Sequence, residues 1–169
     1  MIDEARRPEG LVSPEEMSEL ADELRRRGET IVFTNGCFDL LHVGHLRYLD
    51  EAARLGSLLV VGLNSDRSVA GLKGEGRPLV PEVERAELLL GLRAVDRVVI
   101  FDEDTPLELI RLLRPDVLVK GGDYDPEAAD GAGYIVGSDI VRSYGGEVRT
   151  IPVVPGRSTS RLVGLLRGG

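Results

Sequence analysis

Short apolar segments rich in β-branched residues alternate with helical segments along almost the whole chain, and this limits the possible folds more than any other feature. The apolar segments do not alternate between polar and apolar residues, which indicates strands buried on both faces. Strands of this kind, each followed by a helix, are typical of an open parallel sheet covered on both sides. The expected strands are 30–34, 58–63, 96–101, 116–120 and 147–154. The sequence therefore predicts an α/β, Rossmann-like, doubly wound five-stranded parallel sheet.

Helix signals fill the intervals between these strands. Ser13, Pro14 and two glutamates have the composition of a helix start, and Gly28 is expected to end that helix. The remaining helices are expected at 44–56, 65–72, 81–92, 105–114 with Thr105 as N-cap, 134–146 with an interruption, and 158–167. Residues 1–13 are interpreted as a frayed arm. We thus divide the chain into an N-terminal arm and helix over residues 1–29 and one domain over residues 30–169.

Polar loops follow four of the predicted strands. The carboxyl ends of parallel strands share one edge of the sheet, and ligands of doubly wound proteins bind there. These loops are 35–45, 64–66, 120–124 and 156–160. We expect them to converge on one site.

The loop after the first strand, TNGCFDLLHVGH, contains both histidines of the chain. His42 precedes the predicted helix start and His45 lies in its first turn, so both rings can face the same side. Gly44 lets a ligand approach the backbone, and the N–H groups of a helix start favour anions. This arrangement suits phosphoryl or nucleotidyl transfer, which depends mainly on positioning and electrostatic stabilisation.

Three other interpretations of this loop stay open. The histidines could be structural and satisfied by the backbone. Asp39, His42 and His45 are spaced by threes and could bind zinc, although a further ligand is not evident. Cys37 could act as a nucleophile with a histidine, but a small residue beside the ligand or a buried thiol is the simpler role.

Composition excludes several classes of protein. A net charge of -8, 4% aromatic residues and no Trp argue against a nucleic-acid-binding surface. The single cysteine excludes an internal disulfide framework, and no signal peptide or apolar run of membrane-spanning length is present. We expect a cytoplasmic protein that does not bind membranes. Of the 21 basic residues only Lys73 and Lys120 are lysines, and both lie at Gly-rich loops where an ammonium could contact phosphate.

The segment GCFDLLHVGH resembles the GxFDxxHxGH signature of the cytidylyltransferase-like nucleotidyltransferase family. RSTS, before the last predicted helix, resembles the second signature of this family, with serine where many relatives have a second threonine. IVFTNGCFDLLHVGH, VGLNSDRSVAGLKGEGRP and LVKGGDY are similar to the nucleotidyltransferase domain of bacterial heptose-phosphate enzymes, and the resemblance covers nearly all of residues 30–167. A sugar-kinase domain precedes this domain in many of those enzymes; none is present here, so the chain resembles the stand-alone version.

The resemblance implies a role for each matching residue. His42 and His45 would contact the triphosphate and stabilise the transition state, and Lys73 would draw charge from the α-phosphate. The implied nucleotide-binding residues are Asn35, Gly36, Cys37, Phe38, Gly44, Arg85, Arg157, Ser158, Thr159 and Ser160. The implied sugar-phosphate-binding residues are Asp39, Lys120 and Asp123.

Several of these residues also have simple structural interpretations. Arg85 could form an exposed ion pair on its helix, Ser158 or Thr159 could cap the last helix, and Asp123 could stabilise a turn. Asn64 and Asp66 are interpreted only as the end of a strand and the cap of a helix.

The resemblance implies transfer of AMP from ATP to a sugar 1-phosphate, in the first place D-glycero-β-D-manno-heptose 1-phosphate. Mg²⁺ would be bound through the nucleotide phosphates, without a protein metal site. A homodimer is expected from the general frequency of two-fold dimers. The alternatives are transfer from CTP or GTP to a sugar or polyol phosphate, adenylylation of FMN, and a nucleotide-binding regulatory module without turnover.

Overall fold

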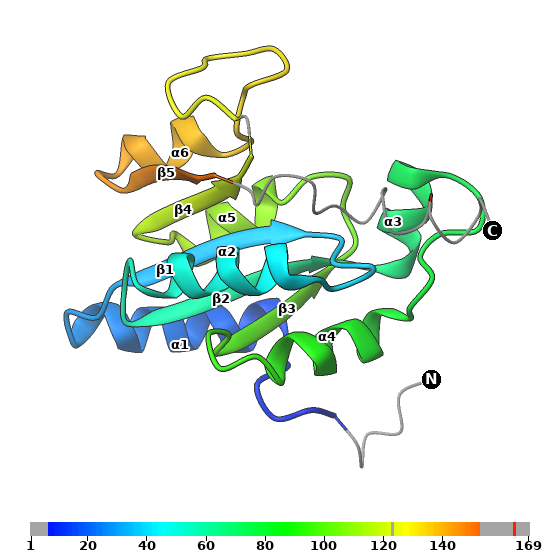
Figure 1. Cartoon of the computed structure of the whole chain (residues 1–169). Coiled ribbons are helices and arrows are strands. Elements are labelled where there is room, and N and C mark those ends of the chain that lie inside the picture. Colours follow the sequence, from blue (N-terminus) through cyan, green and yellow to red (C-terminus); the bar gives the residue numbers. More distant parts are fainter. Residues whose placement is uncertain (1–6, 123, 153–163, 165–169) are drawn as a thin grey trace.

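A parallel sheet organises the chain (Figure 1), of which the computed structural model describes residues 7–122, 124–152 and 164. In this part of the chain five strands pair in the order β3-β2-β1-β4-β5, and all four pairings are parallel. The strands are β1 (Ile31–Gly36), β2 (Leu58–Asn64), β3 (Arg97–Phe101), β4 (Val117–Gly121) and β5 (Glu147–Ile151). The predicted doubly wound five-stranded sheet is confirmed.

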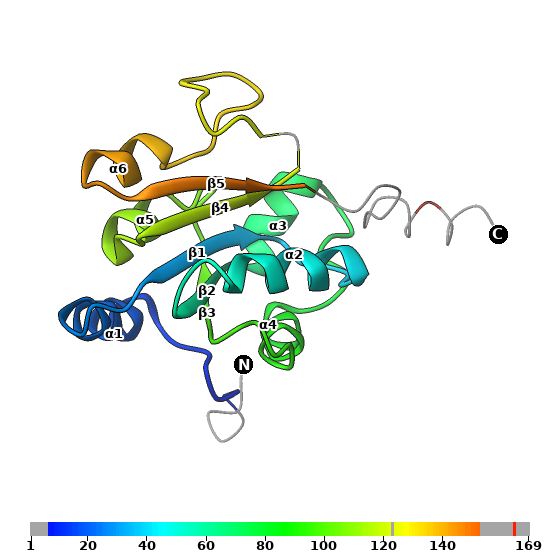
Figure 2. The same ribbon diagram turned by 60° about the vertical axis from the view of Figure 1, so that its left-hand side comes forward.

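Helices cover both faces of this sheet (Figures 1 and 2). They are α1 (Pro14–Arg26), α2 (Val43–Ala53), α3 (Asp66–Lys73), α4 (Glu82–Leu90), α5 (Leu107–Leu113) and α6 (Ser138–Ser143). α2 and α4 pack on one face, where Leu49 and Leu89 belong to the same buried cluster as Val61. α1, α5 and α6 pack on the other face with Met17 and Phe33. Because both faces are covered, the central strands are apolar throughout.

The strand order reverses between β1 and β4, and these two strands diverge toward their carboxyl ends. β1 pairs with β2 as far as Gly36, whereas its pairs with β4 end at Phe33. Beyond that point the hydroxyl of Tyr48, from α2, lies 2.6 Å from Thr34 Oγ1 and donates to the carbonyl of Val119 at 3.2 Å. This buried side chain takes the place of ladder hydrogen bonds. The reversal thus opens the sheet edge where ligands of such folds bind.

Helix starts were predicted with mixed success. Ser13 caps α1 as expected: its Oγ accepts from Glu16 N, and Glu16 Oε2 accepts from Ser13 N, at 3.1 Å and 2.6 Å. Thr105 does not cap α5, which begins after Pro106 without a side-chain cap. The predicted helix at 158–167 lies outside the described residues.

The segment before α1 differs from the expected frayed arm. Leu11 forms a parallel bridge to Val98 on β3, and only 7% of its surface is exposed. Val98 N donates to Gly10 O and Val12 N donates to Val98 O, both at 3.0 Å. These contacts hold residues 10–12 along the free edge of β3. They also place Leu11 in the buried cluster that includes Leu89 of α4.

Within the described residues, no helix combines the length and the apolar character needed to cross a bilayer.

Candidate active site

Two imidazoles close the start of α2. His42 is the N-cap, and its Nδ1 accepts a hydrogen bond from Gly44 N at 3.1 Å. His45 Nδ1 accepts in return from His42 N at 3.4 Å. This is a reciprocal capping box in which histidines replace the usual hydroxyl and carboxylate side chains. The predicted positions of both residues at the helix start are therefore confirmed, and Gly44 N–H is used within the turn.

The cap determines which nitrogen of each ring carries a proton. A neutral imidazole whose Nδ1 accepts must carry its proton on Nε2. The ring centroids lie 4.0 Å apart with 32° between the planes, and the Phe38 ring lies 5.3 Å from His45. Burial, assisted by His42, lowers the pKa of His45 to about 4. At neutral pH His45 is therefore an uncharged ring with an Nε2–H that can donate to an anion.

The low pKa of His45 predicts a pH-dependent loss of stability. Its pKa is about 4 in the folded protein against an ordinary value of 6.5, so the unfolded chain binds the proton first as pH falls through this window. We expect the free energy of unfolding to fall by about 1–2 kcal/mol more in the wild type than in His45→Gln between pH 7 and pH 5. Urea unfolding of both proteins at the two pH values measures this. Equal pH dependence, or an NMR titration of His45 near pH 6.5, would contradict it.

The residues between β1 and the turn form a tight loop. Phe38 has a left-handed φ of 44°, and its ring lies over Gly36, where a Cβ would come within 3.0 Å of Phe38 Cε2. Asn35 Oδ1 is buried and has no hydrogen-bond partner among the described residues. Burial raises the pKa of the partly buried Cys37 thiol, so this residue is a poor nucleophile at neutral pH. The loop thus presents an unused amide oxygen and small groups at the carboxyl end of β1.

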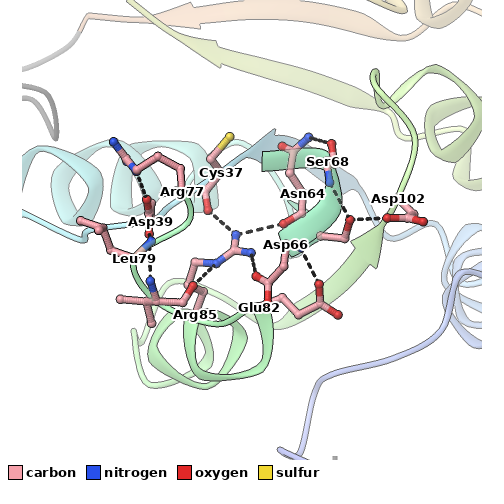
Figure 3. Close-up of polar contacts among 12 residues, drawn as sticks. Cys37, Asp39, Asn64, Asp66, Ser68, Arg77, Leu79, Glu82, Arg85 and Asp102 are labelled. Carbon is pink, nitrogen blue, oxygen red and sulfur yellow. Dashed lines mark hydrogen bonds and ion pairs between the residues drawn. The ribbon is translucent and has the colours of Figure 1, made fainter. Parts of the chain in front are cut away.

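Arg85 lies beneath this loop with a fully buried side chain (Figure 3). Its Nη1 donates to Cys37 O at 2.6 Å and to Asn64 O at 2.9 Å, and its Nε donates to Val80 O at 2.8 Å. Its Nη2 pairs with Asp66 at 2.7 Å. The alternative of an exposed ion pair on α4 is wrong. Arg85 instead joins the ends of β1 and β2 to the segment before α4, so a role at the nucleotide would be indirect in this geometry.

Asp39 also has protein partners. Its Oδ2 accepts from Arg77 Nε at 2.6 Å, and its Oδ1 accepts from the N–H groups of Leu79 and Val80 at 2.7 Å and 3.1 Å. Burial alone would raise the pKa of Asp39, but the hydrogen bonds from Val80, Arg77 and Leu79 lower it overall. The carboxylate that was predicted to bind sugar phosphate is thus engaged with the loop after α3.

The two lysines come from different elements, Lys73 from the end of α3 and Lys120 from β4. Lys73 is exposed at the end of α3, and its charge acts on the Cys37 thiol, as does that of Lys120. Lys120 Nζ donates from β4 to Asn35 O on β1 at 3.4 Å and lies 5.8 Å from the centre of the Tyr124 ring. Burial lowers the pKa of Lys120 to about 8, and Cys37 partly opposes the shift. Lys120 therefore contacts the start of the loop that carries the histidines, and the charge of Lys73 acts on the same loop.

Lys120 is expected to destabilise the protein without ligand. Its pKa is about 8 when folded and 10.5 as an ordinary value, so the folded state gains stability as pH rises through this interval. Lys120→Met should raise Tm by about 2–4 °C at pH 7, and the gain should shrink as pH rises above 8 and vanish above pH 10.5. Lys73→Met, at an exposed position, is the matched control and should leave Tm unchanged. A lower Tm for Lys120→Met at pH 7 would contradict the expectation.

Some predicted site residues cannot be placed. Arg157, Ser158, Thr159, Ser160 and Asp123 lie outside the described residues.

Sequence reasoning missed residues that hold the site together. Asp66 was interpreted as a cap only, yet it is the ionic partner of buried Arg85. Asn64 is buried and donates to Ser68 Oγ at 3.0 Å. Arg77, which lies between Gly76 and Pro78, was not among the predicted site residues, yet its Nε donates to buried Asp39. The two ion pairs join residues 38 and 19 positions apart in the chain, so no local pattern in the sequence indicated them.

The zinc alternative finds no support in the described part of the chain. Asp39 accepts its hydrogen bonds from Arg77, Leu79 and Val80, and the Nδ1 atoms of both histidines accept from backbone N–H groups. Among the described residues no group of three or more His, Cys, Asp or Glu side chains could hold a metal ion.

Comparison with known proteins identifies the family. The model of the family described as Cytidylyltransferase-like matches residues 33–149, which include most of β1, the histidine turn and both lysines. The chain belongs to the cytidylyltransferase-like family. The nucleotidyltransferase family named from the GCFDLLHVGH segment is therefore confirmed.

Relatives of this cytidylyltransferase-like chain share more than half of their aligned residues with it. It is 59% identical over 149 residues to the Bifunctional protein HldE of Syntrophotalea carbinolica, covering 88% of this chain and 29% of the relative. The HldE protein of Koribacter versatilis is 56% identical over 153 residues, or 90% of this chain and 30% of the relative. The chain thus spans less than a third of the length of these relatives.

A solved structure has the same fold. The crystal structure of the lipopolysaccharide core biosynthesis protein from Thermoplasma volcanium aligns with a TM-score of 0.56 and 27% identity, over 75% of this chain and 98% of that chain.

Proposed function

We propose that the chain transfers AMP from ATP to a sugar 1-phosphate, D-glycero-β-D-manno-heptose 1-phosphate, giving ADP-heptose and pyrophosphate. The observation that carries this proposal is the pair of stacked imidazoles at the start of α2, with Lys73 and Lys120 acting on the same loop. The identity to HldE proteins and the fold shared with a lipopolysaccharide core biosynthesis protein support a sugar phosphate as the acceptor.

In the proposed reaction a phosphate oxygen of the sugar phosphate attacks the α-phosphorus of the nucleotide in line, and pyrophosphate leaves. The Nε2–H groups of His42 and His45 donate to phosphate oxygens as negative charge increases in the transition state. Lys73 adds a positive charge on the α-phosphate. Lys120 and Asn35 Oδ1 face the acceptor between β1 and β4, where a cation and an unused acceptor atom suit a phosphorylated polyol.

The site fits a metal ion that arrives with its nucleotide. Both carboxylate oxygens of Asp39 already accept hydrogen bonds, and His42, His45, Lys73 and Lys120 of the site are hydrogen-bond donors or cations rather than anionic ligands. We therefore propose that Mg²⁺ is held by the nucleotide phosphates, where it would neutralise their charge. A homodimer and a cytoplasmic location stay predictions.

The test is a pyrophosphate-release assay with ATP, CTP, GTP and UTP against a panel of sugar 1-phosphates, polyol phosphates and FMN. We expect the largest kcat/KM with ATP and the heptose 1-phosphate. Faster pyrophosphate release with CTP or GTP would change the proposed nucleotide, and faster release with FMN would change the proposed acceptor. If calorimetry shows that a nucleotide binds but no pair of substrates releases pyrophosphate, the chain is a regulatory nucleotide-binding module and not an enzyme.

A further inference from the structure

The segment between α3 and α4 is fastened to the histidine loop through the Asp39 carboxylate, which pairs with Arg77 and accepts hydrogen bonds from Leu79 and Val80. We propose that Arg77 is a positioning residue that acts through Asp39 to place Lys73 beside the His42–His45 turn; this rests on the proposed function. Neither the GCFDLLHVGH segment nor RSTS includes Arg77.

The ion pair is buried and well aligned. The Asp39 side chain is 1% exposed and that of Arg77 is 15% exposed, with 2.6 Å between Arg77 Nε and Asp39 Oδ2. Figure 3 shows Asp39 between Arg77 and Leu79, next to the Cys37 loop. Asp39 lies three residues before His42, so the pair joins the histidine loop directly to the chain that leaves Lys73.

Little else restrains this segment. α3 ends in exposed residues, and Gly74 and Gly76 follow with left-handed φ values of 87° and 79° and no atoms near their Cβ positions. Among the described residues, the ion pair with Asp39 is the only hydrogen bond or salt bridge found for residues 75–78. Beyond it, Leu79 N and Val80 N donate to the same carboxylate. Without Arg77, Asp39 would hold this segment only through the N–H groups of Leu79 and Val80.

Arg77 also keeps the Lys73 ammonium from pairing with Asp39. A buried carboxylate without its partner would attract the nearest cation, and the Lys73 charge already acts on neighbouring Cys37. Arg77 neutralises Asp39 and so leaves the Lys73 ammonium for the α-phosphate. Loss of Arg77 should therefore affect turnover more than substrate binding.

The experiment is a double-mutant cycle between Arg77→Gln and Lys73→Ala. We expect Arg77→Gln to lower kcat by about 10- to 100-fold, because small displacements of a catalytic group have effects of this size, with a much smaller change in KM. If Arg77 acts through Lys73, Arg77→Gln should have almost no further effect on kcat in the Lys73→Ala background. Arg77→Lys, which keeps the charge, should recover part of the kcat.

Arg111→Gln is the matched control, because Arg111 also pairs with a carboxylate, Glu108, but on the exposed surface of α5. Its kcat should equal that of the wild type. Hydrogen exchange at Leu79 and Val80 should become faster in Arg77→Gln and stay unchanged in Arg111→Gln. A full additional loss of kcat in the Lys73→Ala background, or unchanged exchange, would overturn the inference. If the wild type has no turnover, the proposed function is overturned instead. Hydrogen exchange at Leu79 and Val80 would still test whether the Arg77–Asp39 ion pair holds this segment.

Discussion

His42→Ala and His45→Ala are each expected to lower kcat by about 10²–10³-fold, the usual effect of removing one donor to a transition-state oxyanion. The reason lies in the cap, which puts the proton of each neutral ring on Nε2, and in the low pKa of His45, which keeps this ring neutral. Steady-state kinetics with ATP and the heptose 1-phosphate would measure the loss. KM should change much less than kcat.

His42→Asn separates catalysis from helix capping. Asparagine is among the best N-cap residues, so its side-chain oxygen can accept from Gly44 N as Nδ1 does, but it offers nothing at the place of Nε2. We expect His42→Asn to keep the Tm of the wild type, while His42→Ala loses about 1 kcal/mol of stability. Both should have equally low kcat. Recovery of kcat in His42→Asn would show that the cap alone matters.

Arg85→Met is expected to cost about 3–5 kcal/mol of folding free energy, because it leaves an ion pair and three carbonyl groups without their donor. At about 2–4 °C per kcal/mol for a chain of this size, Tm should fall by about 6–20 °C. Differential scanning calorimetry measures this directly. Soluble protein should also lose activity, because the ends of β1 and β2 and the segment at Val80 are no longer joined.

Two further variants define the reason for this loss. Arg85→Lys should recover little, since an ammonium cannot donate in four directions from the plane of a guanidinium. Arg111→Met removes an exposed arginine and should change stability by less than about 0.5 kcal/mol. A Tm for Arg85→Met close to that of Arg111→Met would refute the bracing role.

The regular elements followed closely from sequence because each depends on local signals. The strands and helices lie near the predicted ranges, and the Ser13 cap was found from its composition. Thr105 is also a residue type that favours the N-cap, but it does not cap α5. The N-cap of this helix is the next residue, Pro106, and the helix begins at Leu107. The bridge between Leu11 and Val98 depends on residues far apart in the chain, so no local pattern announced it.

The site was predicted in its location but less well in its internal contacts. Parallel topology places the ends of β1 and β4 together, and this alone brings Lys120 to Asn35. The partners of Arg85 and Asp39 come from loops whose paths depend on the whole fold. From the sequence, charged residues in these loops are expected to be exposed to solvent. In the structure Arg85 and Asp39 are buried and hydrogen-bond to backbone groups.

The reciprocal bonding of His42 and His45 has an evolutionary consequence. The Nδ1 atoms begin α2 whereas the proposed chemistry uses Nε2, so stability and chemistry make separate demands on these two positions. A descendant that no longer needed turnover could replace the imidazoles by asparagine, serine or aspartate and keep its shape. Copies of this domain with such substitutions, alongside an unaltered Arg85 and Asp66, are therefore expected to be folded proteins that have lost their reaction.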